Sequence, residues 1–183
     1  ARSTKDVHTS MSKNRFIIAG GGIGGLAAAL GLAQKGYGSI VLEKSSELSE
    51  IGAGIQLGPN AFHSFDYLGV GDAARKNAVY VDQLRLMDAV SGDEIMHIPL
   101  DEPFRKRFGN PYAVVHRGDL YAVLLRSCQD NDLIEMRVNS DVVGYDQDGN
   151  GVTANLANGE GVAGTALIGA DGLWSAVRRG VVG

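Results

Sequence analysis

The sequence predicts an α/β fold in which a parallel βαβ unit is followed by an appended antiparallel β segment. Two observations lead to this prediction. Between residues 16 and 43, a short apolar run, a glycine turn, a helix-forming stretch and a second apolar run follow one another. From residue 83 onward, apolar and polar residues alternate over short stretches separated by Gly, Asn and Asp, which is typical of antiparallel strands.

The βαβ unit can be followed along the chain. Phe16–Ala19 is a short β-branched and aromatic run, as in a buried parallel strand. Residues 24–34 are rich in Ala and Leu and predict a helix that Gly36 and Gly38 terminate. Residues 39–43 predict a second strand, which must run parallel to the first because a helix crosses between them.

The remaining elements are shorter and mostly extended. Helices are expected at 60–68, 72–77, 118–130 and 175–179, and strands from 83, at 94–98, 112–116, 134–138, 142–146, 152–156 and 164–170.

Composition narrows the classes of function. The chain has 17 Lys and Arg against 21 Asp and Glu, and this net charge of −4 argues against nucleic-acid or anionic membrane partners. Its one cysteine, Cys128, lies on an apolar helical stripe and is expected in the core. The four histidines lack metal-ligand spacing, so no metal site is predicted. Residues 1–15 lack the apolar segment of a signal peptide, and we expect a cytoplasmic protein.

The strongest motif is GxGxxG, formed by Gly20, Gly22 and Gly25 directly after the first predicted strand. Gly20 permits a tight turn, Gly22 leaves room for a pyrophosphate, and Gly25 lets helix and strand pack closely. Backbone N–H groups near Gly24 then face the phosphates at the positive end of the helix. This context predicts a Rossmann-like dinucleotide-binding domain.

Glu43 stands at the end of the second predicted strand. A carboxylate there accepts hydrogen bonds from a ribose diol and repels a 2′-phosphate, so the dinucleotide is FAD or NAD and not NADP. A register shifted to Gly22, Gly24 and Ala27 would assign the same function.

A second motif, ALIGADGLWSAVRR at residues 166–179, favours FAD. An apolar strand ends in Asp171 and Gly172, and Ser175 and Arg178 follow at a helix start. The carboxylate is therefore at the carboxyl end of a strand, where open α/β sheets bind ligands. A nicotinamide domain would usually continue with alternating strands and helices, whereas this chain turns antiparallel.

With this motif the chain resembles the single-component FAD-dependent aromatic-ring hydroxylases, the group of 4-hydroxybenzoate, salicylate and 3-hydroxybenzoate hydroxylases. The resemblance covers nearly all of residues 14–180 and rests on four blocks: the glycine turn with Glu43, the loop EIGAGIQLGPNA at 50–61, HRGDL at 116–120, and the Asp-Gly motif. The loop is most similar to that of the salicylate and 3-hydroxybenzoate 6-hydroxylase branch.

The resemblance implies an FAD-binding domain of the glutathione-reductase type and assigns roles to single residues. It implies that Glu43 and Lys44 hold the adenosine end of FAD, and that Gly54 and Gln56 lie beside the flavin. Lys44 could instead be a surface lysine, and Gln56 an edge-strand residue.

Two further residues receive roles in the same way. The resemblance implies that Arg117 approaches the ribityl or phosphate region of FAD, and that Asp171 supports both FAD and the incoming NADH. Arg117 could instead cap a helix in an ion pair with Asp119, and Asp171 could be a turn former.

The resemblance also implies an activity for the whole protein. It would use NADH and oxygen to hydroxylate a small aromatic acid, 3-hydroxybenzoate or salicylate, and could form a homo-oligomer. A kynurenine-type hydroxylase, an epoxidase and a non-catalytic nucleotide-binding fragment remain alternatives. We expect residues 1–13 to be a disordered leader and 14–183 an FAD-binding domain, with 79–115 contributing strands to an incomplete substrate-side sheet. Catalytic residues would lie beyond residue 183.

Overall fold

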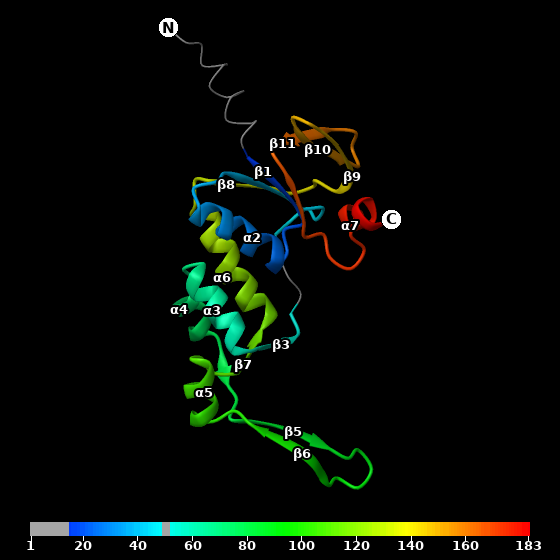
Figure 1. Cartoon of the computed structure of the whole chain (residues 1–183). Helices are drawn as coiled ribbons and strands as arrows, with labels where there is room; N and C mark the ends of the chain where they lie inside the picture. The colour runs from blue at the N-terminus through cyan, green and yellow to red at the C-terminus, as the bar shows by residue number, and fades with distance from the viewer. Residues whose placement is uncertain (1–14, 49–51) are drawn as a thin grey trace. The chain divides into compact units, whose positions relative to one another are not determined.

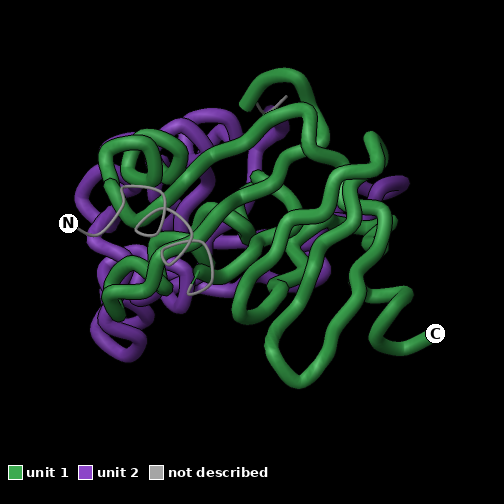
Figure 2. Tube along the Cα trace, turned by 90° about the horizontal axis from the view of Figure 1, so that it is seen from above, with its two compact units in different colours: residues 1–50, 124–183 green, residues 51–123 purple. Residues whose placement is uncertain are grey.

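The computed structural model describes residues 15–48 and 52–183, which belong to two compact units (Figure 2). Unit 1 comprises residues 1–50 and 124–183, and unit 2 comprises residues 51–123. The predicted leader, residues 1–13, lies outside the described residues.

Unit 1 contains the predicted βαβ unit within a four-stranded parallel sheet (Figure 1). The strand order is β12-β1-β2-β8, and the strands are β1 (Phe16–Ala19), β2 (Ser39–Leu42), β8 (Ile134–Arg137) and β12 (Leu167–Gly169). Helix α2 (Ile23–Gln34) connects β1 to β2. The predicted parallel pairing is therefore confirmed.

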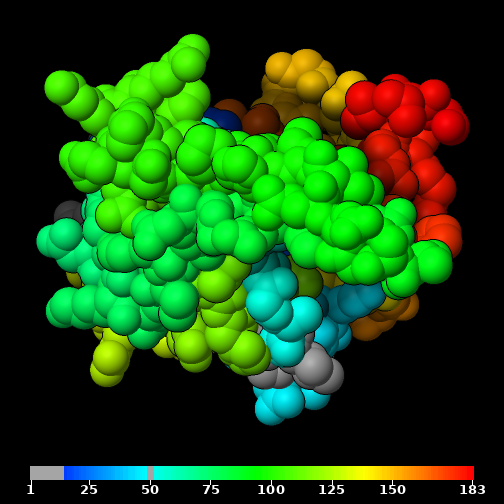
Figure 3. Space-filling view, turned by 90° about the horizontal axis from the view of Figure 1, so that it is seen from below, coloured from blue at the N-terminus to red at the C-terminus, as the bar shows by residue number. Residues whose placement is uncertain are grey.

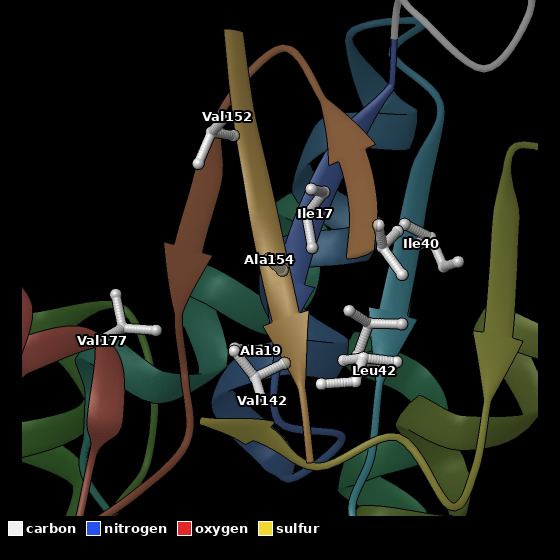
Figure 4. Close-up of a cluster of buried hydrophobic side chains, with 10 residues drawn as sticks. Ile17, Ala19, Ile40, Leu42, Val142, Val152, Ala154 and Val177 are labelled. Atoms are coloured by element: carbon white, nitrogen blue, oxygen red, sulfur yellow. The ribbon is translucent and has the colours of Figure 1, made fainter. Parts of the chain in front are cut away.

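One face of the parallel sheet packs on an antiparallel sheet made of β9 (Val142–Asp148), β10 (Gly151–Leu156) and β11 (Gly161–Gly164). Figure 4 shows the apolar core between the two sheets. Alternate residues of β1 and β2, such as Ile17 and Leu42, contribute one side of it, and β10 contributes Val152 and Ala154. This alternation follows from the two-residue period of a strand.

The other face of the parallel sheet packs on α2. Leu26 and Ala29 of this helix are fully buried. Cys128, near the end of α6 (Arg117–Gln129), donates its thiol to the carbonyl oxygen of Leu26 at 3.5 Å. Burial raises the pKa of this thiol to about 12, so Cys128 is the inert core residue that the sequence predicts.

Among its described residues, unit 2 holds two small antiparallel sheets, three short helices and the start of α6. The first sheet has the order β3-β7-β4, and the second is a β5-β6 hairpin. The elements are β3 (Gly54–Leu57), α3 (Pro59–Tyr67), α4 (Gly71–Lys76), β4 (Val79–Tyr80), β5 (Gln83–Met87), β6 (Glu94–Pro99), α5 (Glu102–Phe108) and β7 (Ala113–His116).

The β5-β6 hairpin exposes apolar side chains. Ile95 is 62% exposed, Leu86 53% and Met96 51%. The green atoms of this segment are visible at the surface in Figure 3. An isolated two-stranded hairpin is marginally stable in water, so this segment needs further cover to be well ordered.

The predicted strand at residues 164–170 is wrong in one respect. It consists of two strands, because the chain passes there from one sheet to the other. Gly164 at the end of β11 pairs antiparallel with Val152, whereas Leu167 at the start of β12 pairs parallel with Ile17. Neither strand is fully buried: β11 alternates between exposed and buried residues, and β12 is only partly buried.

Helix α5 was not predicted, although its signals are present. Asp101 is its N-cap, Pro103 lies in its first turn, and Gly109 ends it in a left-handed conformation with φ of 73°. These are the usual start and stop residues of a helix.

No helix among the described residues is long and apolar enough to cross a membrane.

Candidate functional site

The glycine turn after β1 depends on glycine at two positions for steric reasons. Gly20 has a φ of +102°, and a Cβ there would lie 2.4 Å from the carbonyl oxygen of Ala170. A Cβ at Gly25 would lie 1.9 Å from the carbonyl oxygen of Gly20. These contacts agree with the turn and the close helix–strand packing that the motif predicts.

Gly22 and Gly24 have different surroundings from Gly20 and Gly25. A Cβ at either position would meet no protein atom within 4 Å among the described residues. Gly22 is the extended N-cap of α2, no side chain caps this helix, and its first turn has no acidic residue. The positive end of α2 is therefore bare backbone in front of open space, which suits an anionic ligand such as a pyrophosphate.

Glu43 follows β2 and is bound to the glycine turn. Its Oε2 accepts a hydrogen bond from the N–H of Gly21 at 2.7 Å, and its Oε1 accepts one from the N–H of Ser45 at 2.9 Å. Burial alone raises the pKa of Glu43, but the backbone donors of Ser45 and Gly21 lower it more, so the pKa lies below its ordinary value. Each oxygen keeps a lone pair that can accept a ribose hydroxyl.

The segment around Glu43 is held by residues that follow β8. The N–H of Asn139 donates to the carbonyl oxygen of Ser45 at 2.9 Å, and the N–H of Ser140 donates to that of Glu43 at 2.8 Å. Lys44, which lies between Glu43 and Ser45, is exposed. Asn139 has a φ of 52° and is not among the residues predicted from the sequence. An asparagine just after a predicted strand was the available signal, since Asn tolerates this conformation.

Asp171 follows β12 and orders the start of α7 (Ala176–Val182). Its Oδ1 accepts from the hydroxyl of Ser175 at 2.5 Å, and its Oδ2 accepts from the N–H groups of Ala176 at 2.7 Å and Val177 at 3.2 Å. Burial raises the pKa of Asp171, but these hydrogen bonds lower it further, so its pKa is below the ordinary value. The alternative structural role of Asp171 is thus present in the fold.

The predicted residues of unit 1 meet at one edge of the parallel sheet. The glycine turn, Glu43 and Asp171 follow β1, β2 and β12, which are neighbouring parallel strands. Their carboxyl ends share one edge, as in other ligand-binding α/β sheets. Bare N–H groups for phosphates and a carboxylate for a ribose fit the pyrophosphate and adenosine parts of a dinucleotide.

The other predicted residues belong to unit 2. Gly54 and Gln56 lie on the exposed face of β3, where a Cβ at Gly54 would meet no described atom within 4 Å. Arg117 opens α6, and its backbone N–H donates to the carbonyl oxygen of Ala53 at 3.0 Å. Arg117 is therefore held next to Gly54, whose register partner is His116, whereas Gln56 lies two residues further along β3, opposite Val114.

Among residues 15–48 and 52–183, no group of three His, Cys, Asp or Glu side chains could hold a metal ion. The predicted residues of unit 1 offer a ligand backbone N–H donors and carboxylate acceptors.

Comparison with known proteins agrees with this geometry. The chain is 54% identical over 170 residues to 3-hydroxybenzoate 6-hydroxylase 1 of Aquipseudomonas alcaligenes, which covers 93% of the chain and 43% of that protein. It is 50% identical over 167 residues to 3-hydroxybenzoate 6-hydroxylase of Polaromonas naphthalenivorans, covering 91% and 42%. The predicted resemblance to this branch is confirmed, and the chain spans less than half the length of these relatives.

A similar fold is found in a solved structure. A variant of 2-methyl-3-hydroxypyridine-5-carboxylic acid oxygenase matches with a TM-score of 0.79 at 29% identity, covering 93% of this chain and 42% of that one. The sequence model described as FAD binding domain matches residues 13–182. The chain therefore belongs to the FAD-binding domain family, and FAD is its cofactor.

Proposed function

We propose that the protein containing this chain is an FAD-dependent monooxygenase that hydroxylates a hydroxybenzoate with NADH and oxygen. The observation that carries the proposal is the 54% identity to a 3-hydroxybenzoate 6-hydroxylase over almost the whole chain. 3-Hydroxybenzoate is accordingly the substrate we propose first, with salicylate second. We place this activity in the cytoplasm, where NADH is available.

The fold that we propose in finer detail is the glutathione-reductase type of FAD domain. Its support is the parallel sheet with the glycine turn and Glu43 at neighbouring strand ends. Residues 79–115 would contribute strands to a substrate-side sheet, and the exposed apolar hairpin β5-β6 supports this, because such a surface needs cover.

The residues of unit 1 would hold the nucleotide part of FAD. Backbone N–H groups at Gly22 and Gly24 would bind the pyrophosphate, with Gly20 and Gly25 shaping the turn. Glu43 would accept from the ribose hydroxyls, and the exposed Lys44 would border the adenosine.

The remaining predicted contacts concern the flavin end and the co-substrate. Gly54 and Gln56 would lie beside the flavin ring, and Arg117 near the ribityl or phosphate groups. Asp171 would support FAD and NADH through the loop that it orders before α7. Bound FAD would activate oxygen, so that one oxygen atom is transferred to the aromatic ring of the substrate. This chain supplies binding and orientation.

The ribose assignment can be tested by titrating the cofactor-free protein with FAD. Glu43→Ala removes a charged acceptor, and a hydrogen bond to a charged group contributes about 1.5–3 kcal/mol. We expect FAD affinity to fall about 10- to 100-fold. Glu43→Gln, which keeps one oxygen acceptor, should lose less.

The control is Asp132→Ala. Asp132 is an exposed carboxylate just before β8, at the amino ends of the parallel strands and so opposite the end where Glu43 lies. It should leave the affinity unchanged. An unchanged affinity in Glu43→Ala would exclude Glu43 as the ribose ligand.

The reaction is tested on the full-length protein with FAD, NADH and oxygen. We expect dihydroxylated product from 3-hydroxybenzoate, measured by chromatography. Flavin absorption bands without product from 3-hydroxybenzoate or salicylate would favour another member of the group. Absence of flavin bands after addition of FAD would favour a non-catalytic role.

A further inference from the structure

A side-chain hydrogen bond in unit 2 fixes the orientation of Gln56. The hydroxyl of Tyr112 donates to Oε1 of Gln56 at 2.5 Å. Gln56 lies opposite Val114 in the register of β3 and β7, so Tyr112 reaches it diagonally on the same face of the sheet. The opposite face is formed by buried residues such as Leu57 and Ala113.

The bond sets the orientation of the amide, with Oε1 toward the Tyr112 hydroxyl. A glutamine amide has an oxygen that accepts and an –NH2 group that donates. Tyr112 takes one of the two lone pairs of the oxygen, and within the described residues no hydrogen bond engages the nitrogen, so the –NH2 group is the free donor of the amide. Gln56 is exposed, and a Cβ at the neighbouring Gly54 would meet no described atom within 4 Å. The face therefore offers a flat glycine backbone beside an oriented N–H donor.

Tyr112 is itself held from two sides. Its carbonyl oxygen accepts from the N–H of Val81 at 3.1 Å, and Pro111 before it restricts the backbone. Its ring lines an apolar groove of about 470 Å³ together with Leu84, Leu100, Phe104 and Phe108. Tyr112 is partly buried at the wall of this groove and has two side-chain torsions, whereas Gln56 on an exposed edge strand has three and would otherwise sample several rotamers.

We propose that Tyr112 is a positioning residue that presents the –NH2 group of Gln56 to the flavin, an inference that rests on the proposed function. The carbonyl oxygens and unprotonated ring nitrogens of a flavin are acceptors, and an amide turned the other way would place an oxygen against them. Tyr112 touches no cofactor atom in this role. It acts only through Gln56.

The contact is tested first without cofactor. Tyr112→Phe keeps the ring in the groove and removes the hydroxyl. We expect the side-chain amide resonances of Gln56 to shift in the NMR spectrum of the FAD-free protein, while the thermal melt remains cooperative. Tyr37→Phe makes the same change on an exposed tyrosine of unit 1 and should leave these resonances in place. Unchanged Gln56 resonances in Tyr112→Phe overturn the inference, whatever the fate of the proposed function.

The role is tested on the full-length protein with FAD. Tyr112→Phe should shift the visible flavin maxima and weaken FAD binding about two- to tenfold, the range of one neutral hydrogen bond. In a Gln56→Leu background the same change should have no further effect. An equal effect in that background shows a structural role and overturns the inference.

Gln56→Glu provides a second variant that leaves Tyr112 intact. It keeps an acceptor for the tyrosine hydroxyl and removes the –NH2 group, so the flavin maxima should again shift. Unshifted maxima in Gln56→Glu contradict the inference alone. Absence of flavin bands in the unmodified protein contradicts the proposed function as well, and the two failures are thereby distinguished.

Discussion

At the scale of single residues, glycine occupies different positions of the same motif for different physical reasons. Gly25 has no room for a side chain because the carbonyl oxygen of Gly20 lies where its Cβ would be. Gly22 has ample room among the described atoms. Its glycine is therefore not explained by packing against the described protein atoms, and close approach of a ligand to the backbone is the reason that we propose.

This difference predicts different outcomes for two valine variants. Gly25→Val should lower the thermal stability of the FAD-free protein, because helix and strand must separate. Gly22→Val should melt close to the unmodified protein but lose FAD binding in a titration, since its branched side chain fills the approach to the backbone. Equal destabilisation of both variants would contradict these roles and the register of the motif.

Two buried serines offer a matched comparison of hydrogen bonding. Ser39 in β2 is 2% exposed, and its Oγ has no partner among the described residues. Ser140 is 1% exposed, and its Oγ donates to the carbonyl oxygen of Val138 at 3.0 Å. An unpaired buried hydroxyl carries a desolvation cost, whereas a typical paired one contributes about 0.5–1.5 kcal/mol.

We therefore expect opposite effects of alanine on the free energy of unfolding. Ser39→Ala should leave it unchanged or raise it by up to about 1 kcal/mol, and Ser140→Ala should lower it by about 1 kcal/mol. Urea denaturation of both variants measures the difference. A larger loss in Ser39→Ala than in Ser140→Ala would mean that the hydroxyl of Ser39 is satisfied in solution.

At the scale of elements, the loop between β12 and α7 is organised by nested caps. The Oγ of Ser175, the N-cap of α7, accepts from the N–H of Arg178 at 2.9 Å, and Asp171 binds two further N–H groups of the helix start. The side chain of Arg178 returns to the carbonyl oxygen of Leu173 at 2.6 Å. The loop is thus held by polar contacts within one short segment.

The lowered pKa of Asp171 gives this element a pH dependence. The pKa of Asp171 is lower in the folded protein than in the unfolded chain, where it is about 3.9. The carboxylate therefore stabilises the fold fully at pH values above the unfolded pKa. This contribution is lost as the pH falls through the folded pKa. Asp171→Asn should therefore be less stable than the unmodified protein at pH 7, by about 0.5–2 kcal/mol as for a lost cap. The difference should shrink as the pH falls below about 4.

Thermal melts of both proteins from pH 7 to pH 3 measure this difference. Asp132→Asn, an exposed carboxyl change in the same unit, should stay within about 0.5 kcal/mol at every pH. A difference between Asp171→Asn and the unmodified protein that is independent of pH would show that the carboxylate charge does not stabilise α7.

At the scale of the whole molecule, the chain is an FAD-binding domain that matches only part of the length of its relatives. Its relatives have more than half of their length outside the matched region. Hydroxylation requires orientation of the substrate and exclusion of water, and misplacement of reacting groups costs orders of magnitude in rate.

We expect the 183-residue chain by itself to bind FAD weakly and to form no hydroxylated product. With FAD, NADH, oxygen and 3-hydroxybenzoate, peroxide should appear in place of the dihydroxylated acid, whereas the full-length protein under the same conditions should give product. Turnover by the chain alone at about 1 per second or faster would contradict this, because it would place a complete active site within these residues.

Local sequence patterns alone were enough to predict much of this fold. The βαβ unit, the glycine turn, Glu43 at the end of β2 and the buried Cys128 were all predictable, because each depends on neighbours in the chain or on the period of one element. The family could be recognised for the same reason, since its motifs are continuous segments.

Contacts between distant segments were decided only by the tertiary structure. The sheet switch after Gly164, the support of Glu43 by Asn139 and the bond from Tyr112 to Gln56 join residues whose partners no local pattern specifies. Periodicity reports which residues are buried, but not which buried strand lies beside which. Continuous sequence motifs thus identified the family and its cofactor, whereas the packing of the strands determined which of the predicted residues lie at the same end of the sheet.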